Sequence, residues 1–208
     1  GVSERSQQCR GFNGKGYKTC ETFNSRTYAS MKFCSQCGSQ AMLFSIPDGD
    51  NRHRHCCQGC GEIHYQNPRM ICGALATSGN QILLCRRAIE PRKGFWTLPA
   101  GFMENGETTE EAAIRETREE AEAELESQGI YTIFNLPHMN QVYFFFRGEI
   151  KEGRFGVGIE TIESKLFYPE EIPWDLLAFR TVKRSLELFL QDKTEGHFPI
   201  RMESIFHK

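Results

Sequence analysis

Two short cysteine motifs constrain the fold of this chain more than any other feature of its sequence. The motifs are Cys-x-x-Cys pairs with nineteen residues between them: Cys34 and Cys37, then Cys57 and Cys60. A glycine directly follows each pair (Gly38, Gly61) and lets the turn close so that both thiolates face one ion. Zn²⁺ prefers four soft ligands in a tetrahedron, and four thiolates leave no open position for water. The spacing therefore predicts a structural zinc, and it excludes Cys56 because only Cys57 has the required spacing.

The cysteine usage also indicates a reducing compartment. The 208 residues include nine cysteines, but the first thirty residues lack the apolar core of a secretory signal. Metal spacing rather than a disulfide framework explains the two pairs. No thioredoxin-like strand–helix–strand pattern surrounds them, which argues against a redox protein. We therefore expect a cytoplasmic protein.

Residues 1–30 differ in composition from the rest of the chain. They are polar, rich in Ser, Thr and Gly, and slightly basic, so they bury too little apolar surface to become ordered. We predict a disordered extension at 1–30, with ordered sequence and an alternative start at Met31. Because transit peptides are also rich in Ser and Arg, a plastid location is the alternative to the cytoplasm.

The bulk composition excludes several classes of function. The net charge is -2, and the basic residues are scattered rather than arranged in a stripe, so we expect no nucleic-acid partner. No apolar run reaches the ~18 residues that span a bilayer, so we expect no membrane association.

Periodicity and turn residues predict a mixed α/β fold after the cysteine module. Strands are expected at 70–77, 81–87, 130–135, 141–150 and 165–168, and helices at 108–125 and 181–191. Thr108 and Glu111 make a capping box that starts the first helix. Strands mixed with two helices favour an α/β sandwich over a doubly wound parallel sheet. The expected units are a zinc ribbon at 31–68, a catalytic domain at 69–192 and a C-terminal tail at 193–208.

A glycine loop followed by an acidic helix carries the chemistry. Glu116, Glu119 and Glu120 share one helical face at the spacing i, i+3, i+4. Three like charges would repel each other there, whereas Mg²⁺ prefers carboxylate oxygens and removes that conflict. Such an ion binds a diphosphate and polarises a water molecule. From charge alone, a solvated acidic face is the better explanation, and the flanking residues decide between the two.

The flanking residues resemble the Nudix box, G-x5-E-x7-R-E-U-x-E-E-x-G-U. The matching positions are Gly101, Glu107, Arg115, Glu116, Glu119 and Glu120. Two positions depart from the pattern. Thr117 replaces an aliphatic residue, and Glu122 replaces a glycine that helps to end the helix, so we expect the helix to run on to about Leu125.

The resemblance extends from about Met31 to about Asp192 and is to the zinc-ribbon Nudix hydrolases. Its segments are Phe33–Gly38, Tyr65–Pro68, Leu83–Arg87, Trp96–Gly101 and Asn135–His138. It implies a Nudix α/β/α sandwich with a mixed sheet behind a zinc ribbon, with catalytic Mg²⁺ (or Mn²⁺) and structural Zn²⁺. It also implies hydrolysis of the diphosphate bond of nucleoside diphosphate derivatives, which releases a nucleoside monophosphate. FAD and ADP-ribose, the substrates of the plant chloroplast members, are favoured.

The same resemblance implies roles for individual residues. Glu116, Glu119 and Glu120 bind Mg²⁺, with the carbonyl of Ala100 as a further ligand. Glu116 or Glu119 orients or deprotonates the attacking water, and Arg115 holds a glutamate by a charge-assisted hydrogen bond.

Further residues are expected around this centre. A later loop usually supplies another metal-binding acid, for which Glu163 is the expected residue and Glu160 the alternative. Relatives commonly carry Pro-Gly-Pro-Glu where Val157–Glu160 stands here. The residues expected to contact a small dinucleotide substrate are Arg86, Gln141 and Tyr143.

Two other functions stay open. NADH pyrophosphatases also join a zinc ribbon to a Nudix domain, but their S-Q-P-W-P-F-P-x-S stretch is missing after Glu120. A non-catalytic reader of nucleotides or nucleic acids is the second alternative, and the intact glutamates argue against it. A homodimer is also left open, since no interface can be identified in the sequence.

Overall fold

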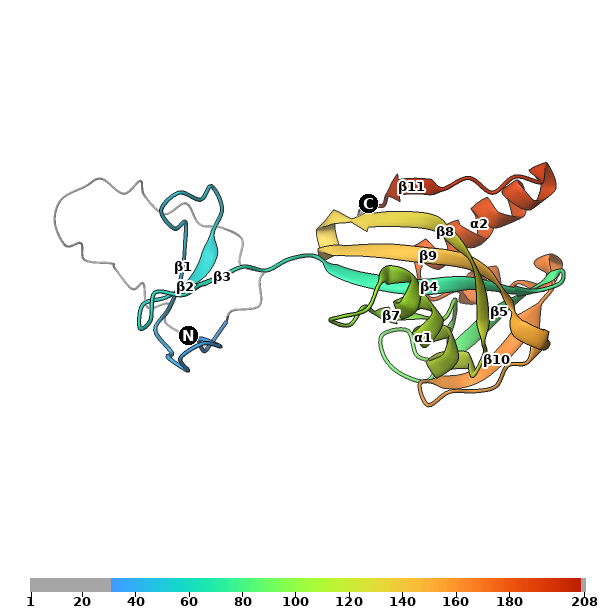
Figure 1. The fold of residues 1–208 in the computed structure, drawn as a ribbon, viewed down its shortest axis with the longest axis horizontal. Helices are drawn as coiled ribbons and strands as arrows, with labels where there is room; N and C mark the ends of the chain where they lie inside the picture. The colour runs from blue at the N-terminus through green and yellow to red at the C-terminus, as the bar shows by residue number, and fades with distance from the viewer. Residues whose placement is uncertain (1–30, 207–208) are drawn as a thin grey trace, which may run out of the picture. The chain divides into compact units, whose positions relative to one another are not determined.

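The computed structural model describes residues 31–206, so the extension predicted at 1–30 lies outside the described residues. The chain divides into two compact units between Gln66 and Asn67 (Figure 1). The first unit contains a three-stranded sheet, and the second contains a larger sheet with two helices. No helix in the described part of the chain is both long and apolar enough to cross a membrane.

The first unit has almost no apolar core. Its antiparallel strands are β1 (Met42–Ser45), β2 (Arg54–Cys57) and β3 (Ile63–His64), in that order. Within residues 31–66, only Cys34 and Cys57 are buried. The interior of this unit is therefore made of sulfur rather than aliphatic side chains, so it depends on something other than hydrophobic burial for its stability.

The second unit is built on a mixed sheet with the strand order β10-β5-β4-β9-β8-β11. Its long strands are β4 (Arg69–Ser78), β5 (Gln81–Arg87), β8 (Leu125–Leu136), β9 (Gln141–Ile150), β10 (Thr161–Phe167) and β11 (Arg201–Ser204). The short strands β6 (Trp96–Thr97) and β7 (Ala100–Phe102) pair with β5 and β4. Strands β4 and β9 run parallel, as do β8 and β11, and the other pairs are antiparallel.

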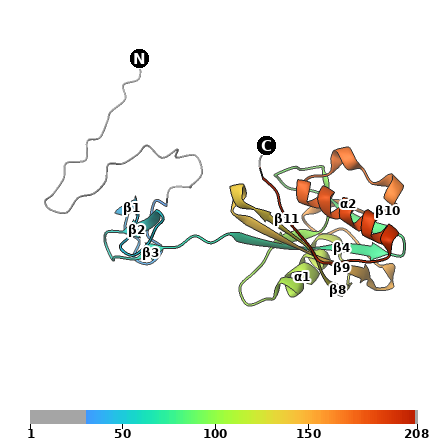
Figure 2. The same ribbon diagram turned by 90° about the horizontal axis from the view of Figure 1, so that it is seen from above.

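Two helices cover opposite faces of this sheet: α1 (Thr109–Ala121) and α2 (Arg180–Glu195) (Figure 2). Leu75 of β4 packs in one cluster with Leu186 of α2, whereas its neighbour Ala74 packs in another cluster with Ala121 of α1. Adjacent residues of a strand face opposite sides, so each face of β4 contributes to its own core. Short 3₁₀ turns lie at Pro137–Met139, Lys151–Gly153, Pro169–Glu171 and Trp174–Leu176. The predicted α/β/α sandwich with a mixed sheet is confirmed.

The capping box at the start of α1 is present, but the predicted end of this helix is wrong. Thr108 and Glu111 exchange their hydrogen bonds as expected. The helix stops at Ala121 rather than running on to Leu125, because Glu122 adopts a left-handed backbone with φ of 49°. The N–H of Gly156 then donates to the carbonyl of Ala121 at 2.6 Å, so a distant loop completes the end of the helix.

Residues 193–208, expected to be a tail, contain a strand of the main sheet. Strand β11 pairs in parallel with β8 and is joined to α2 by a buried carboxylate. Asp192 is fully buried, and it accepts hydrogen bonds from the Tyr131 hydroxyl at 2.7 Å and from Arg201. Burial alone would raise the pKa of Asp192, but these two donors lower it below the ordinary value for aspartate.

Replacing Asp192 with alanine should lower the free energy of unfolding by about 2–3 kcal/mol, because it leaves a buried hydroxyl and a guanidinium without their acceptor. The lowered pKa means that the stabilisation is present at neutral pH and is lost as the pH falls through that value. Urea unfolding at pH 7 measures the effect, with Asp175→Ala as an exposed control. Equal stability of the two variants would contradict the prediction.

Candidate active site and zinc centre

The four predicted zinc ligands come together in the first unit. The Sγ atoms of these cysteines all lie within 4.8 Å of one another. Those of Cys34 and Cys60 are 3.7 Å apart, and those of Cys37 and Cys57 are 3.6 Å apart. A tetrahedral zinc with Zn–S bonds of about 2.3 Å separates its sulfur atoms by about 3.8 Å. Both the donor set and its dimensions fit a Zn²⁺ ion.

The cluster favours a thiolate at Cys57, whereas the pKa of Cys60 is raised to about 12 and that of Cys37 is also raised. A hydrogen bond from the backbone N–H of Cys60 is the main cause that lowers the pKa of the Cys57 thiol to about 6. Cys56 is not part of the cluster, as its spacing predicted. The sequence did not predict the position of His64, whose Nε2 lies 3.3 Å from the Sγ of Cys34. A histidine N–H that donates to a ligating sulfur would fix its orientation.

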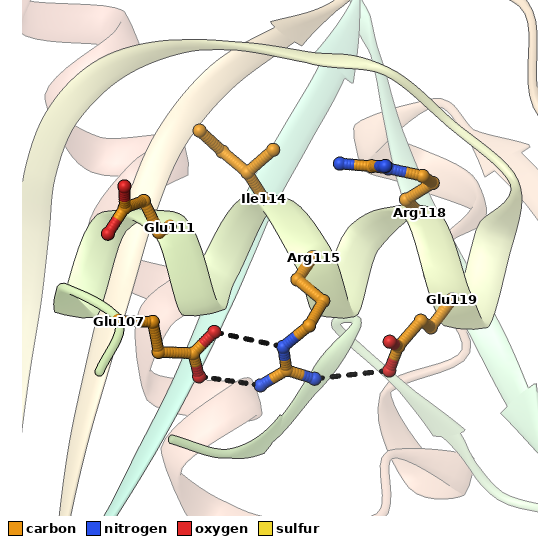
Figure 3. A pocket seen from close by; sticks show the side chains of 6 residues that line it. All are labelled: Glu107, Glu111, Ile114, Arg115, Arg118 and Glu119. Atoms are coloured by element: carbon orange, nitrogen blue, oxygen red, sulfur yellow. Dashed lines mark hydrogen bonds and ion pairs between the residues drawn. The ribbon is translucent and has the colours of Figure 1, made fainter. Parts of the chain in front are cut away.

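Arg115 connects the glycine loop to the acidic face of α1 (Figure 3). Its guanidinium donates two hydrogen bonds to Glu107, at 3.0 and 2.8 Å, and a further one to the carbonyl of Phe102 at 3.1 Å. Its Nη1 also donates to Glu116 at 2.7 Å and to Glu119 at 3.1 Å. These hydrogen bonds lower the pKa of Glu107 to about 2 and raise that of Arg115. Arg115 therefore orients two of the three predicted metal ligands, and Glu107 anchors Arg115.

The other carboxylates of this face are held close to the loop. Glu116 and Glu120 are each 8% exposed. A Cβ atom at Gly101 would overlap with the carboxylate of Glu116, so glycine is required for this close approach. The N–H of Ala100 donates to Glu120 at 3.3 Å. The fold thus holds two acidic side chains with little solvent exposure beside the glycine loop.

The electrostatics of this pair fit a hard cation. Burial, and then the proximity of Glu116, raise the pKa of Glu120 to about 8, and burial also raises the pKa of Glu116. A divalent ion bound by these oxygens would favour the charged form of both groups. Glu119 lies one turn from Glu116 and has an exposed side chain, so it can reach the same ion from the solvent side.

The three glutamates line a cavity of ≈ 1660 Å³ in the second unit. The predicted substrate residues Gln141 and Tyr143 line the same cavity, as does Ala100. The structure therefore brings these predicted residues together around one space.

Arg86 and Glu163 do not line this cavity. They face each other in an ion pair at 3.8 Å, and Arg86 also donates to the carbonyl of Gly94. The neighbouring Arg87 lines the cavity instead, because adjacent residues of β5 point to opposite faces of the sheet. Arg86 therefore does not lie where its expected role would place it, and Arg87 occupies the corresponding position in the cavity wall.

Glu160 rather than Glu163 reaches the cavity from the later loop. The N–H of Gly158 donates to the carbonyl of Glu120 at 3.1 Å, and the N–H of Ala88 donates to the carbonyl of Glu160 at 2.9 Å. The charge of Glu160 contributes to the raised pKa values of Glu116 and Glu120, which places it near both. The structure therefore favours the alternative assignment of the late carboxylate.

The part of the cavity that α2 supplies was not predicted from the sequence. Phe179 and Thr181 line it together with Arg87, whose guanidinium lies over the Phe179 ring at 5.2 Å. The face of the sheet to which Arg87 points could have been predicted, because successive residues of a strand point to opposite faces. No local signal marked Thr181, because its place depends on how α2 packs across the sheet.

Comparisons with known proteins agree with this arrangement. The family described as Nudix N-terminal, a zinc ribbon, matches residues 32–66, and the NUDIX domain matches residues 67–188. The crystal structure of a NUDIX hydrolase from Nitrosomonas europaea is 45% identical, with a TM-score of 0.79. That similarity covers 84% of this chain and 100% of the other.

Two curated relatives are more distant. One, from Pseudomonas aeruginosa, is described as NAD-capped RNA hydrolase NudC and is 28% identical over 81% of this chain and 59% of its own length. The other, from Methanocaldococcus jannaschii, is described as an ADP-ribose pyrophosphatase and is 29% identical over 52% of this chain and 67% of its own length. The chain thus spans only about 59% of the length of the NudC relative. The domain matches and the Nitrosomonas structure show that the chain belongs to the Nudix family, with a Nudix-type zinc ribbon ahead of its Nudix domain.

Proposed function

We propose that this chain hydrolyses the diphosphate bond of a nucleoside diphosphate linked to a second group, using Mg²⁺ or Mn²⁺. Water attacks one phosphorus, the bond from that phosphorus to the bridging oxygen breaks, and the products are a nucleoside monophosphate and the phosphate of the second group. The observation that carries this proposal is the pair of buried carboxylates, Glu116 and Glu120, in the wall of a cavity large enough for a dinucleotide.

Each glutamate of the acidic face has its own role in the proposed reaction. Glu116 and Glu120, fixed by the close approach of Gly101 and the N–H of Ala100, would hold the metal ion. The bound ion would neutralise the diphosphate and polarise a water molecule. Glu119, on the solvent side of the same face, would orient that water or accept its proton.

Glu160 would act as the later carboxylate of the site. Replacing Glu160 with glutamine should lower kcat roughly a hundredfold, because the site loses one negative ligand or proton acceptor. Glu163→Gln is a matched control, because Glu163 lies only three positions away in the sequence and does not line the cavity, and its kcat should stay near that of the wild type. Steady-state kinetics with one diphosphate substrate compare the two. A larger loss of kcat in Glu163→Gln than in Glu160→Gln would instead support Glu163 as the later carboxylate of the site.

The proposed substrates are FAD and ADP-ribose. The relative from Methanocaldococcus jannaschii, described as an ADP-ribose pyrophosphatase, supports this class. NADH is the second candidate, because the NudC relatives are described as hydrolases of RNA that is capped with the related dinucleotide NAD. We expect a small dinucleotide rather than a nucleic acid as the partner, and a homodimer stays open. The seven free cysteines among residues 31–206 and the four-thiol cluster favour a reducing compartment such as the cytoplasm.

A substrate panel tests the proposal. FAD, ADP-ribose, NADH and nucleoside triphosphates are incubated with the chain and Mg²⁺, and the products are identified by mass. The proposal predicts a nucleoside monophosphate from at least one dinucleotide, and no product when EDTA replaces Mg²⁺. Nucleotide binding without any cleavage would favour the non-catalytic reader.

A further inference from the structure

The two edges of the main sheet differ in how they are protected. One edge is β10, and the other is β11, beyond which no strand lies among the described residues (Figure 1). The edge at β10 carries Glu163 and Lys165, and a bulge interrupts its pairing with β5. Charged residues and bulges keep an edge strand from pairing with another chain. Strand β11 pairs with β8 in an unbroken register and contains neither lysine nor proline, so its edge is open to a further strand.

The backbone of β11 presents hydrogen-bonding groups at this edge. The N–H of Ile205 donates to the carbonyl of Asn135 in β8 at 2.8 Å. Because the backbone groups of successive residues alternate in direction along a strand, those of Met202 and Ser204 point away from β8. Outside the pairing with β8, no hydrogen bond within residues 31–206 involves them. They are the donors and acceptors with which an added strand would pair.

An apolar row crosses the sheet and ends at this edge. Residues paired across neighbouring strands lie on one face of a sheet, and the row runs from Phe144 of β9 through Ile133 of β8 to Met202 of β11. Phe144 and Ile133 are partly buried, whereas Met202 is 70% exposed. Ile200, two residues earlier, is 61% exposed. Apolar side chains thus continue to the last strand and stay exposed there.

The opposite face of β11 carries two residues of opposite charge. Arg201 pairs with Asp192, and Glu203 accepts hydrogen bonds from Arg184 at 2.9 and 2.7 Å. The side chains of Arg201 and Glu203 are still 32% and 36% exposed. The order of base, apolar residue and acid at 201–203 is self-complementary. When two such strands pair antiparallel around Met202, each arginine lies opposite a glutamate.

We propose that β11 pairs antiparallel with β11 of a second copy of this chain, around a two-fold axis at Met202. The N–H and carbonyl of each Met202 then bond to those of the other, and Arg201 lies opposite Glu203 of the second copy. A register centred on Glu203 is disfavoured, because it brings two carboxylates together. The pairing joins the two apolar rows, covers both Met202 side chains and extends the sheet from one chain into the next.

Sedimentation equilibrium of the zinc-loaded full chain tests this pairing. The mass of the wild type should rise from one chain to two as its concentration increases through the micromolar range, as expected for a small interface. Met202→Glu should weaken the association roughly a hundredfold, because it places two carboxylates against each other at the two-fold axis. A wild type that stays monomeric throughout this range would overturn the proposal.

Ile162→Glu is the matched control on the other edge of the sheet. Ile162 of β10 is an apolar residue that is 47% exposed, and its variant should dimerise as the wild type does. A dimer that is lost in Ile162→Glu and kept in Met202→Glu would place the interface at β10 and overturn the proposal. No residue of β11 lines the cavity, so the result is independent of the proposed hydrolysis.

Introduced cysteines measure the register without adding a charge. Residues opposite each other in a hydrogen-bonded antiparallel pair have Cα atoms about 5.5 Å apart, which a disulfide can span. Met202→Cys should therefore form a disulfide-linked dimer under mild oxidation, above the background of the wild-type cysteines. Ser204→Cys should stay at that background, because Ser204 would lie opposite Ile200 of the second copy. Equal cross-linking of these two variants would contradict a two-fold axis at Met202.

Discussion

Replacing Glu119 with glutamine should lower kcat by on the order of a thousandfold while the chain stays folded. The substitution keeps the size of the side chain and removes one negative ligand from the proposed metal site, where stabilisation of charge in the transition state contributes several kcal/mol. The side chain of Glu119 is 58% exposed, and its partner Arg115 keeps its hydrogen bonds to Glu107. Little stability should therefore be lost, so the effect belongs to catalysis.

The matched control for this variant is Glu110→Gln. Glu110 lies on the same helix, is exposed and does not line the cavity. Its variant should keep the wild-type kcat and the same unfolding midpoint. Saturation with Mg²⁺ separates weak metal binding from a lost proton acceptor, because only the former is recovered at high Mg²⁺. A near-normal rate in Glu119→Gln at low Mg²⁺ would remove this residue from the catalytic set.

Removing zinc should unfold the first unit and leave the second unit folded. Residues 31–66 bury only two cysteine side chains, so metal binding must supply the stability that an apolar core would otherwise give. In small zinc modules this contribution is about 10–16 kcal/mol. The protein should contain about one zinc per chain. After chelation, hydrogen exchange should show lost protection at β1 and β2 and retained protection at β4 and β9.

Two substitutions sharpen the zinc prediction. Cys57→Ser removes a ligand and should reproduce the exchange pattern of the chelated protein. Cys56→Ser changes the adjacent residue, which lies outside the cluster, and should keep both the zinc and the protection. Unchanged protection of β1 and β2 in metal-free protein would contradict a structural role for zinc.

The strands of the second unit were largely predictable because their signals are local. Strands β5 and β9 begin and end where their apolar runs predict, at Gln81–Arg87 and Gln141–Ile150. Strand β11 was missed because Arg201–Ser204 is short and gains its pairing from β8, about seventy positions earlier in the chain. The end of α1 was misplaced for a similar reason, since Gly156 of a distant loop completes it.

The site was predictable where a motif fixes the geometry and less so elsewhere. Fixed spacing along one helix brings Glu116, Glu119 and Glu120 to one face, so their grouping follows from the sequence. Arg86 and Arg87 are adjacent in β5 and point to opposite faces of the sheet, so an error of one position changes which of them is expected in the cavity. The choice between Glu160 and Glu163 depends on a loop conformation, for which the sequence offers no periodicity.

The proposed activity depends above all on a divalent cation that binds to the acidic face of α1 in the cavity. Titration of the chain with Mn²⁺, followed by the loss of the free-ion signal in electron paramagnetic resonance, measures this binding directly in the zinc-loaded protein. We predict that the wild type binds Mn²⁺ and that Glu116→Gln and Glu120→Gln each weaken this binding at least tenfold, whereas Glu110→Gln leaves it unchanged. Equal Mn²⁺ affinity in all four proteins would contradict it.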